Sequence, residues 1–196
     1  MWAGALEHME HRLSSFKHDT PIQFSRQRIS QICVNLAEKP SGVYQINVPT
    51  GSGKTLSSLR FALAHAARWN KSRIIFTSPL LTILEQNAKV IRSFVGDDSI
   101  ILEHHSNVIR NTDRAEILDQ MALLEDSWQS PIIITTLVKL LNTLFSGKTS
   151  CIRRFQSLCD SIIIIDEVQT VPSKMLTLFN LAVNFLSDIC GATVVL

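Results

Sequence analysis

The sequence predicts an α/β fold in which helices cover both faces of a mostly parallel sheet. Short apolar runs rich in isoleucine and valine recur along the chain, with amphipathic segments between them. Uninterrupted apolar runs are typical of parallel strands that are buried on both faces, whereas alternating runs are typical of half-exposed strands. Because such strands alternate with helices, we expect three layers, with ligands bound at the carboxyl ends of the strands.

The positions of the elements follow from the same patterns. Strands are expected over residues 43–48, 73–77, 100–103, 131–135, 161–165 and 192–196. Apolar residues at helical spacing predict helices over 29–36, 56–66 and 176–186. The segment 107–130 is less regular, but Asp113 and Glu116 have the spacing of a capping box before a helix.

Length and composition favour one globular domain. The 196 residues are 45% hydrophobic, which suits residues 21–196 as a single domain after an N-terminal segment, 1–20, that is expected to be helical. No apolar run is long enough to span a bilayer and the first residues lack a secretion signal, so we expect a cytoplasmic protein without a membrane partner. A net charge of +2 neither demands nor excludes nucleic acid.

The cysteines do not form a recognisable metal or disulfide pattern. Cysteines occupy positions 33, 151, 159 and 190, with no C-x-x-C pair and no paired histidines nearby. This spacing argues against a zinc site and a disulfide scaffold. We therefore expect buried free thiols.

The strongest chemical signal is the segment 48–55, Val-Pro-Thr-Gly-Ser-Gly-Lys-Thr, between an expected strand and an expected helix. Glycines let backbone N–H groups approach phosphate oxygens, and the helix N-terminus favours the same anion. Lys54 would contact the β and γ phosphates of ATP, and the Thr55 hydroxyl would ligate Mg²⁺. The alternative is a Gly-Ser turn with a chance Gly-Lys-Thr. The expected nucleotide-binding residues are Pro49, Thr50, Gly51, Ser52, Gly53, Lys54 and Thr55.

An acidic pair forms the second signal. Asp166 and Glu167 follow the apolar run Ser-Ile-Ile-Ile-Ile, so they are expected where a buried strand ends. Asp166 would hold Mg²⁺, and Glu167 would polarise the water that attacks ATP. Taken alone, the two acids could merely end a strand. Together with Lys54 they predict a magnesium- and ATP-dependent site.

The two signals resemble motifs I and II of superfamily 2 helicases, whose Pro-Thr-Gly-x-Gly-Lys-Thr form also lacks the first glycine of the usual phosphate loop. From about residue 21 to the end, the chain is further similar to the CRISPR-associated helicase–nucleases of type I systems. This similarity is carried by residues 56–65, 73–80, 83–87, 103–107, 131–136 and 166–172.

The resemblance implies a RecA-like fold and the first motor lobe of an ATP-dependent helicase. In such an enzyme, ATP hydrolysis drives movement along single-stranded DNA that the CRISPR surveillance complex, Cascade, hands over. The chain ends before motif III, and we expect the second helicase lobe and the HD nuclease domain to lie outside it, since His18 and Asp19 lack the other ligands of such a nuclease. We therefore expect residues 1–196 to bind nucleotide but to hydrolyse it poorly.

The resemblance also implies roles for individual side chains. It places the DNA backbone near Ser78, Pro79, Gln86, His105, Thr135 and Thr136. Short hydroxyl and amide groups suit contacts to phosphate that do not depend on base sequence. The threonines could instead cap a helix, and the glutamine and histidine could be ordinary solvated or hydrogen-bonded polar residues.

Two further roles concern the nucleotide. Gln23 and Arg26 resemble the segment that reads adenine in these helicases, although ordinary helix-start chemistry is the alternative for this stretch. Gln169 is counted with the catalytic residues, at a position where many relatives carry histidine. A glutamine both donates and accepts hydrogen bonds without titrating, so it could still communicate with the second lobe.

Other functions remain open on the sequence alone. The chain could be a lobe of another superfamily 2 enzyme, such as an RNA helicase or a restriction translocase. It could also be a non-catalytic adaptor that binds the surveillance complex without working as a motor.

Overall fold

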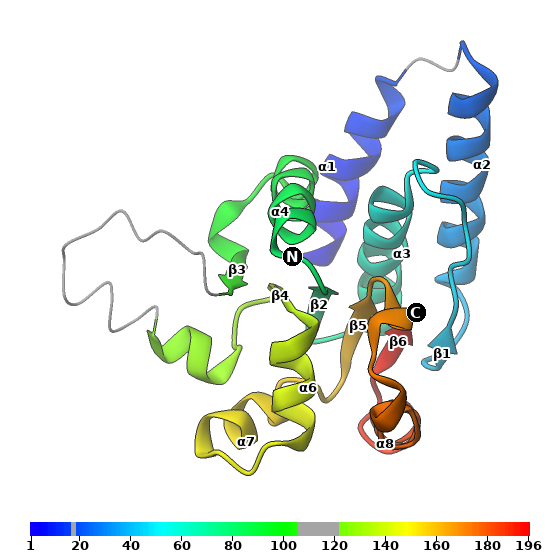
Figure 1. Cartoon of the computed structure of the whole chain (residues 1–196). Helices are drawn as coiled ribbons and strands as arrows, with labels where there is room; N and C mark the ends of the chain where they lie inside the picture. Colours follow the sequence, from blue (N-terminus) through cyan, green and yellow to red (C-terminus); the bar gives the residue numbers. More distant parts are fainter. Residues whose placement is uncertain (17–18, 106–121) are drawn as a thin grey trace.

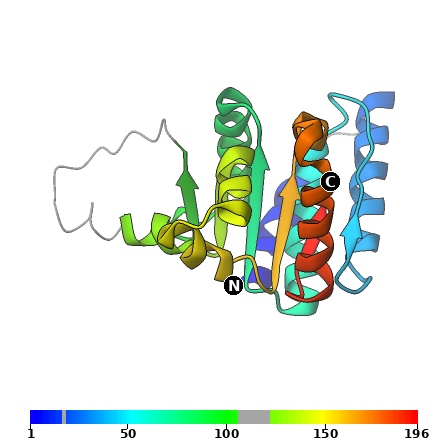
Figure 2. The ribbon, with the colours of Figure 1, turned by 60° about the horizontal axis from the view of Figure 1, so that its bottom comes forward.

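The computed structural model describes residues 1–16, 19–105 and 122–196. A six-stranded sheet runs through these residues in the order β1-β6-β5-β2-β4-β3, and all of its neighbouring strands pair in parallel (Figure 2). The expected parallel α/β fold is confirmed. The strands are β1 (Val43–Tyr44), β2 (Arg73–Ser78), β3 (Ile101–His104), β4 (Ile132–Thr136), β5 (Ser161–Ile165) and β6 (Thr193–Val195).

The six strands lie where the sequence predicts them, and only the first is much shorter. It was expected over 43–48, but β1 contains two residues at one edge of the sheet, where it pairs with β6 alone. One further backbone bond, from Ile46 N–H to the carbonyl of Leu196 at 2.8 Å, continues this pairing. Beyond it the chain leaves the sheet.

Helices cover both faces of the sheet (Figure 1). One face carries α1 (Trp2–Ser14), α2 (Pro21–Leu36), α3 (Lys54–Trp69) and α4 (Leu81–Val95), and the other carries α6 (Leu137–Phe145), α7 (Thr149–Gln156) and α8 (Leu176–Asp188). The described part of the chain also contains three short 3₁₀ turns, η1 (Asp98–Ile100), η2 (Val168–Thr170) and η3 (Ser173–Met175). The expected capping pair, Asp113 and Glu116, and His18 lie outside the described residues.

Apolar residues divide alternately between two hydrophobic clusters, one on each face. In β2, Ile74 and Phe76 belong to the cluster under α1–α4, whereas Ile75 belongs to the cluster under α6–α8. Successive strand residues point to opposite faces, so a strand buried on both sides needs an unbroken apolar run. This requirement explains why the isoleucine runs identified the sheet.

The N-terminal helix is part of the first cluster. Trp2, Ala5 and Met9 of α1 are buried against it. Gly96 ends α4 with a φ of 78°, and a Cβ there would meet the ring of His8 at 2.9 Å. A residue with a side chain would be strained at this φ, and the exposed His8 ring would have to move aside. Within the described residues, no helix is both long and apolar enough to cross a membrane.

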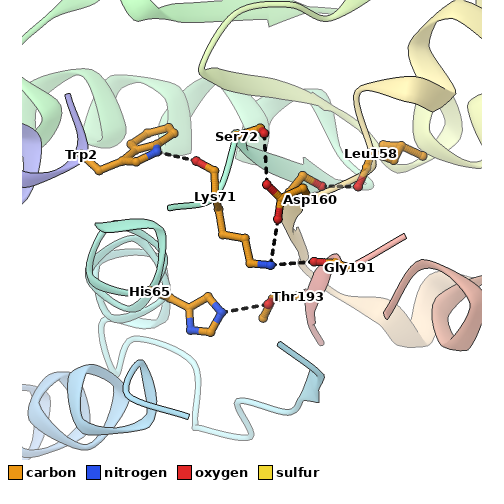
Figure 3. A network of polar contacts seen from close by, with 9 residues as sticks. Trp2, His65, Lys71, Ser72, Leu158, Asp160, Gly191 and Thr193 are labelled. Carbon is orange, nitrogen blue, oxygen red and sulfur yellow. Dashed lines mark hydrogen bonds and ion pairs between the residues drawn. The ribbon is translucent and has the colours of Figure 1, made fainter. Parts of the chain in front are cut away.

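A polar network ties the amino-terminal end of the sheet together (Figure 3). The Trp2 indole donates to the backbone carbonyl of Lys71 at 2.6 Å. The Lys71 ammonium, whose side chain is 5% exposed, donates to Asp160 Oδ1 at 3.1 Å and to the carbonyl of Gly191 at 2.6 Å. Ser72 Oγ donates to the second oxygen of the Asp160 carboxylate. The network thus connects α1 with the segments that lead into β2, β5 and β6.

His65 makes the stability of the domain depend on pH. Its ring is fully buried, with Nδ1 3.0 Å from the Ala37 carbonyl and Nε2 2.9 Å from Thr193 Oγ1. Burial lowers the pKa of His65, with Lys71 adding to the effect and the Ala37 hydrogen bond opposing it. The unfolded chain therefore binds a proton, near pH 6.5, that the folded chain still excludes.

We expect the free energy of unfolding to fall as the pH drops below about 6.5, until the folded-state pKa of His65 is reached. The contribution of this one group is at most about 1.4 kcal/mol per pH unit. Urea unfolding at a series of pH values should show a shallower dependence for His65→Gln, since the amide keeps a donor and an acceptor without titrating. Identical slopes for both proteins would contradict this assignment.

Candidate functional site

The phosphate loop connects the edge strand β1 with α3 at the carboxyl ends of the strands. It turns at Ser52, whose N–H donates to the carbonyl of Pro49 at 3.2 Å. Gly51 and Gly53 have φ values of 77° and 86°, which residues with a Cβ rarely adopt. Gly53 also supplies the carbonyl for the first backbone bond of α3, from Ser57 N–H at 3.0 Å. The two glycines therefore set the shape of the loop.

Lys54 and Asp166 meet across this edge of the sheet. Lys54 Nζ lies 3.0 Å from Asp166 Oδ1, and their side chains are 32% and 19% exposed. Asp166 directly follows β5, and its N–H donates to the carbonyl of Thr77 at 3.0 Å, which extends the pairing of β5 with β2. Two residues that are 112 positions apart in the sequence thus form an ion pair.

Asn87 of α4 also belongs to this site, although the sequence does not single it out. The Thr55 hydroxyl donates to Asn87 Oδ1 at 3.0 Å. Both line a small pocket, of about 20 Å³, together with Lys54, Ser78 and Asp166. A volume of this size holds about one water molecule. Asn87 falls in the segment 83–87 that carries the family similarity, and its position on α4 offers no other signal.

Two serine hydroxyls at the site are buried and have no hydrogen-bond partner among the described residues. They are Ser52 Oγ in the phosphate loop and Ser78 Oγ at the end of β2. A buried hydroxyl without a partner costs stability, and polar ligands often complete such sites. The loop, the pocket and these hydroxyls together offer donors to an anion.

Glu167 and Gln169 form a turn immediately after Asp166. Glu167 has a φ of 55°, unusual for a residue with a side chain, and its carbonyl accepts from Thr170 N–H at 2.9 Å. The Gln169 amide donates to the Glu167 carboxylate, and Gln169 is exposed. The glutamine therefore orients the acid next to Asp166.

A larger cavity of about 490 Å³ lies between α1, α2 and α3 and reaches the phosphate loop at Gly53. Arg26 lines it and donates through Nε to the carbonyl of Gly51 at 2.9 Å. Leu13, in the last turn of α1, and Phe16, which follows that helix, form part of the apolar wall. This contribution of the N-terminal segment is not evident in the sequence, because it depends on how α1 packs.

Gln23 also lines the cavity, but it completes the capping box of α2, whose N-cap is Thr20. Its Oε1 accepts from the N–H groups of Asp19 and Thr20 at 2.9 and 3.0 Å, and Thr20 Oγ1 accepts from Gln23 N–H. The helix-start chemistry considered from the sequence is thus present. The remaining donors of Gln23 are the two hydrogens of its amide nitrogen.

The residues proposed to contact DNA lie at or after the carboxyl ends of β2, β3 and β4. Gln86 is exposed on α4 and Pro79 is partly exposed, whereas Ser78 is 1% exposed. Thr136 caps α6, since its Oγ1 accepts from Lys139 N–H at 3.2 Å. Thr136 therefore caps a helix, which was the alternative role considered for the two threonines.

The other two candidates are buried. Thr135 is fully buried and donates to the carbonyl of His104 at 2.8 Å. The His105 side chain is 2% exposed, with its Nε2 3.2 Å from Glu103 Oε2. These contacts place both residues within the edge of the sheet, so their roles toward DNA remain predictions.

His104, the last residue of β3, is the centre of a buried network of hydrogen bonds. Trp128 Nε1 donates to His104 Nδ1 at 2.8 Å, and Lys139 Nζ lies 2.9 Å from His104 Nε2. An indole nitrogen only donates, so His104 Nδ1 accepts and Nε2 carries the hydrogen. Lys139 Nζ can accept that hydrogen only as a neutral amine. Burial lowers the pKa of Lys139, the charge of Arg154 lowers it further, and Glu125 partly opposes both.

Comparison with known proteins agrees with this arrangement. Two crystal structures of T. fusca Cas3, as Cas3-ATP and Cas3-ADP, share the fold with TM-scores of 0.70 and identities of 19% and 17%. Each match covers 98% of this chain and 22% of the Cas3 chain, so this chain spans about a fifth of that protein. No curated protein matches the sequence. The DEAD/DEAH box helicase family model matches residues 27–186, which include the phosphate loop and the acidic pair. The chain therefore belongs to the DEAD/DEAH box helicase family.

Proposed function

We propose that this chain is the ATP-binding lobe of an ATP-dependent single-stranded DNA translocase that acts in CRISPR type I interference. The observation that carries the ATP-binding part is the contact between Lys54 and Asp166 at 3.0 Å, within a chain that belongs to a helicase family. The likeness to Cas3-ATP and Cas3-ADP supports the nucleotide, and it favours the CRISPR role over an RNA helicase or a restriction translocase.

The residues at the site suit ATP with Mg²⁺. The loop between Pro49 and Lys54 offers backbone N–H groups, and the unpaired Ser52 hydroxyl adds a donor for phosphate. The Asp166 carboxylate and the Thr55 hydroxyl are the hard oxygen ligands that Mg²⁺ prefers. Magnesium, when bound, would neutralise charge on the β and γ phosphates. Lys54 would turn from Asp166 to the same phosphates.

The acidic turn would prepare the attacking water. Glu167 would accept a proton from water as ATP is hydrolysed, and the Gln169 amide would hold the carboxylate in place. Because Gln169 does not titrate, it would keep this contact across the pH range. Its exposure leaves it accessible to the second lobe that we expect in the full enzyme.

The base of the nucleotide would enter the cavity between α1, α2 and α3. Arg26 already bonds the phosphate loop, so its guanidinium would stack on adenine from a fixed position. Gln23 would contribute only as a donor, because its carbonyl oxygen caps α2. The Gln23 amide could donate to a ring nitrogen of adenine that accepts hydrogen bonds.

DNA would pass over the carboxyl ends of β2, β3 and β4. Pro79, Gln86 and the capping Thr136 lie there with some exposure, whereas Ser78, His105 and Thr135 are buried at the same edge. Cascade would deliver the strand, and a second lobe and an HD nuclease would complete the enzyme.

The alternative, an adaptor without motor activity, would bind its partner equally well when Lys54 and Asp166 are replaced. This result would distinguish an adaptor from a motor.

Nucleotide binding by residues 1–196 tests the proposal. A fluorescent ATP analogue should bind in the presence of Mg²⁺, with weaker binding for Asp166→Asn. ATP turnover should be slow with or without single-stranded DNA, because arginine fingers contribute about 10³-fold or more where they operate. No binding of the analogue by the folded chain would reject an ATP site, and brisk DNA-stimulated turnover would reject the dependence on a second lobe.

Asn87 should tune the affinity for Mg²⁺. Its Oδ1 accepts the Thr55 hydroxyl hydrogen, so the hydroxyl lone pairs are left to face the pocket. We expect Asn87→Ala to raise the Mg²⁺ concentration needed for ATP binding by about 10-fold, the lower end for partners of metal ligands. Magnesium titration at fixed nucleotide measures this shift. Gln86→Ala, at the neighbouring exposed position, should leave it unchanged.

A further inference from the structure

Two cysteines are in register at the amino-terminal end of the sheet. Cys159 precedes β5 and Cys190 precedes β6, and each lies three positions before the paired residues Ile162 and Thr193. Adjacent strands lie about 4.8 Å apart. A disulfide requires Cα atoms about 4.4–6.8 Å apart, a range that contains this spacing.

Backbone and ion-pair contacts keep the two segments together. Asp160 N–H donates to the carbonyl of Cys190 at 2.8 Å. The buried Lys71 ammonium bonds both Asp160 and Gly191, the residues that directly follow the two cysteines (Figure 3). One side chain thus fixes the spacing of both cysteine-bearing turns.

The two thiols are neighbours, and each is partly accessible to solvent. Burial, followed by a hydrogen bond with Cys159, raises the pKa of Cys190 to about 11. Cys159 and Cys190 are partly exposed, whereas Cys33 and Cys151 are 4% and 3% exposed. All four thiols are free, as expected, but the expected burial holds only for Cys33 and Cys151, because Cys159 and Cys190 lie in turns.

We propose that Cys159 and Cys190 form a reversible dithiol–disulfide pair that reacts with low-molecular-weight disulfides such as glutathione disulfide. The first protein thiolate attacks the glutathione disulfide, forms a mixed disulfide and releases one glutathione thiolate. The second protein thiolate then attacks the protein sulfur of that mixed disulfide and releases the second glutathione. The two protein thiols lose two electrons and two protons, and glutathione disulfide gains them as two glutathione thiols.

The pair lies at the opposite end of β5 from Asp166. Closure would therefore bind β5 to the end of α8 without changing the phosphate loop. A cross-link that closes a loop of about 30 residues restricts the unfolded chain. For a domain of this size we expect the melting temperature to rise by about 5–10 °C.

The experiment uses the full 196-residue chain with glutathione disulfide at pH 8. Remaining thiols are alkylated, and peptides are mapped by mass spectrometry without reduction. We expect a Cys159–Cys190 cross-link, two alkylated cysteines, a higher melting temperature and unchanged binding of the fluorescent ATP analogue. Dithiothreitol should reverse the first three changes.

Single substitutions separate the proposed pair from general thiol oxidation. Cys159→Ser and Cys190→Ser should each lose the cross-link and the rise in melting temperature, and Cys33→Ala should keep both. The proposal is overturned if the cross-link involves Cys33 or Cys151. It is equally overturned if both cysteines of the pair carry only glutathione, or if all four thiols stay free.

Discussion

Replacing Lys54 with alanine should abolish detectable ATP binding. The ammonium is the one charged donor of the phosphate loop, and it lies beside Asp166, where the terminal phosphates are expected. A hydrogen bond to a charged group contributes about 1.5–3 kcal/mol, and Lys54 would make more than one. Two such bonds correspond to a loss of at least about 100-fold in affinity.

Titration with the fluorescent ATP analogue measures this effect. Lys148→Ala is the matched control, because Lys148 is exposed next to α7 on the opposite face of the sheet. Circular dichroism should show both variants folded, since Lys54 is partly exposed and lies outside the hydrophobic clusters. Unchanged binding by Lys54→Ala would mean that the phosphate loop has been assigned to the wrong segment.

The second large effect is expected from Trp128→Ala, which should lower the free energy of unfolding by about 3–5 kcal/mol. Trp128 is fully buried in the cluster under α6–α8, and Arg154 lies over its ring at 5.6 Å. Removing the indole leaves a large cavity and takes away the donor to His104 Nδ1. A buried acceptor without a partner adds to the cost.

Urea denaturation followed by circular dichroism measures this loss, because the fluorescence of the protein changes with the substitution. Trp128→Phe should cost less, since it retains most of the ring volume and loses only the N–H donor. Trp69→Ala is the control: that indole is 39% exposed at the end of α3 and should cost about 1 kcal/mol. A loss from Trp128→Ala that does not exceed the control would show that the cluster repacks around the gap.

Sequence patterns were most informative where one physical cause acts on consecutive residues. Burial of both faces requires the unbroken run Ile162 to Ile165, and a phosphate loop requires glycine at positive φ, as at Gly53. These features identify β5, the phosphate loop and the approach of Lys54 to Asp166. The fold and the centre of the site could therefore be predicted.

Contacts between distant side chains leave no comparable pattern. The bond from Thr55 to Asn87 joins two helices, and the Lys71 network joins residues 89 and 120 positions apart. Hydroxyl-bearing residues are ambiguous for another reason, because Thr136 caps α6 by the same chemistry that would bind phosphate. Such roles depend on packing, which local sequence does not record.

The ion pair between Lys54 and Asp166 should couple the binding of nucleotide to the binding of a metal ion. Each charge neutralises the other, so nucleotide that draws Lys54 away leaves a carboxylate that then attracts a cation. A metal ion on Asp166 likewise releases the ammonium for an anion. The two ligands should therefore bind with positive cooperativity, each increasing the affinity for the other by the same factor. Because Lys54 would exchange Asp166 for phosphate and Asp166 would exchange Lys54 for Mg²⁺, the site would prefer the magnesium complex of the nucleotide over either component alone.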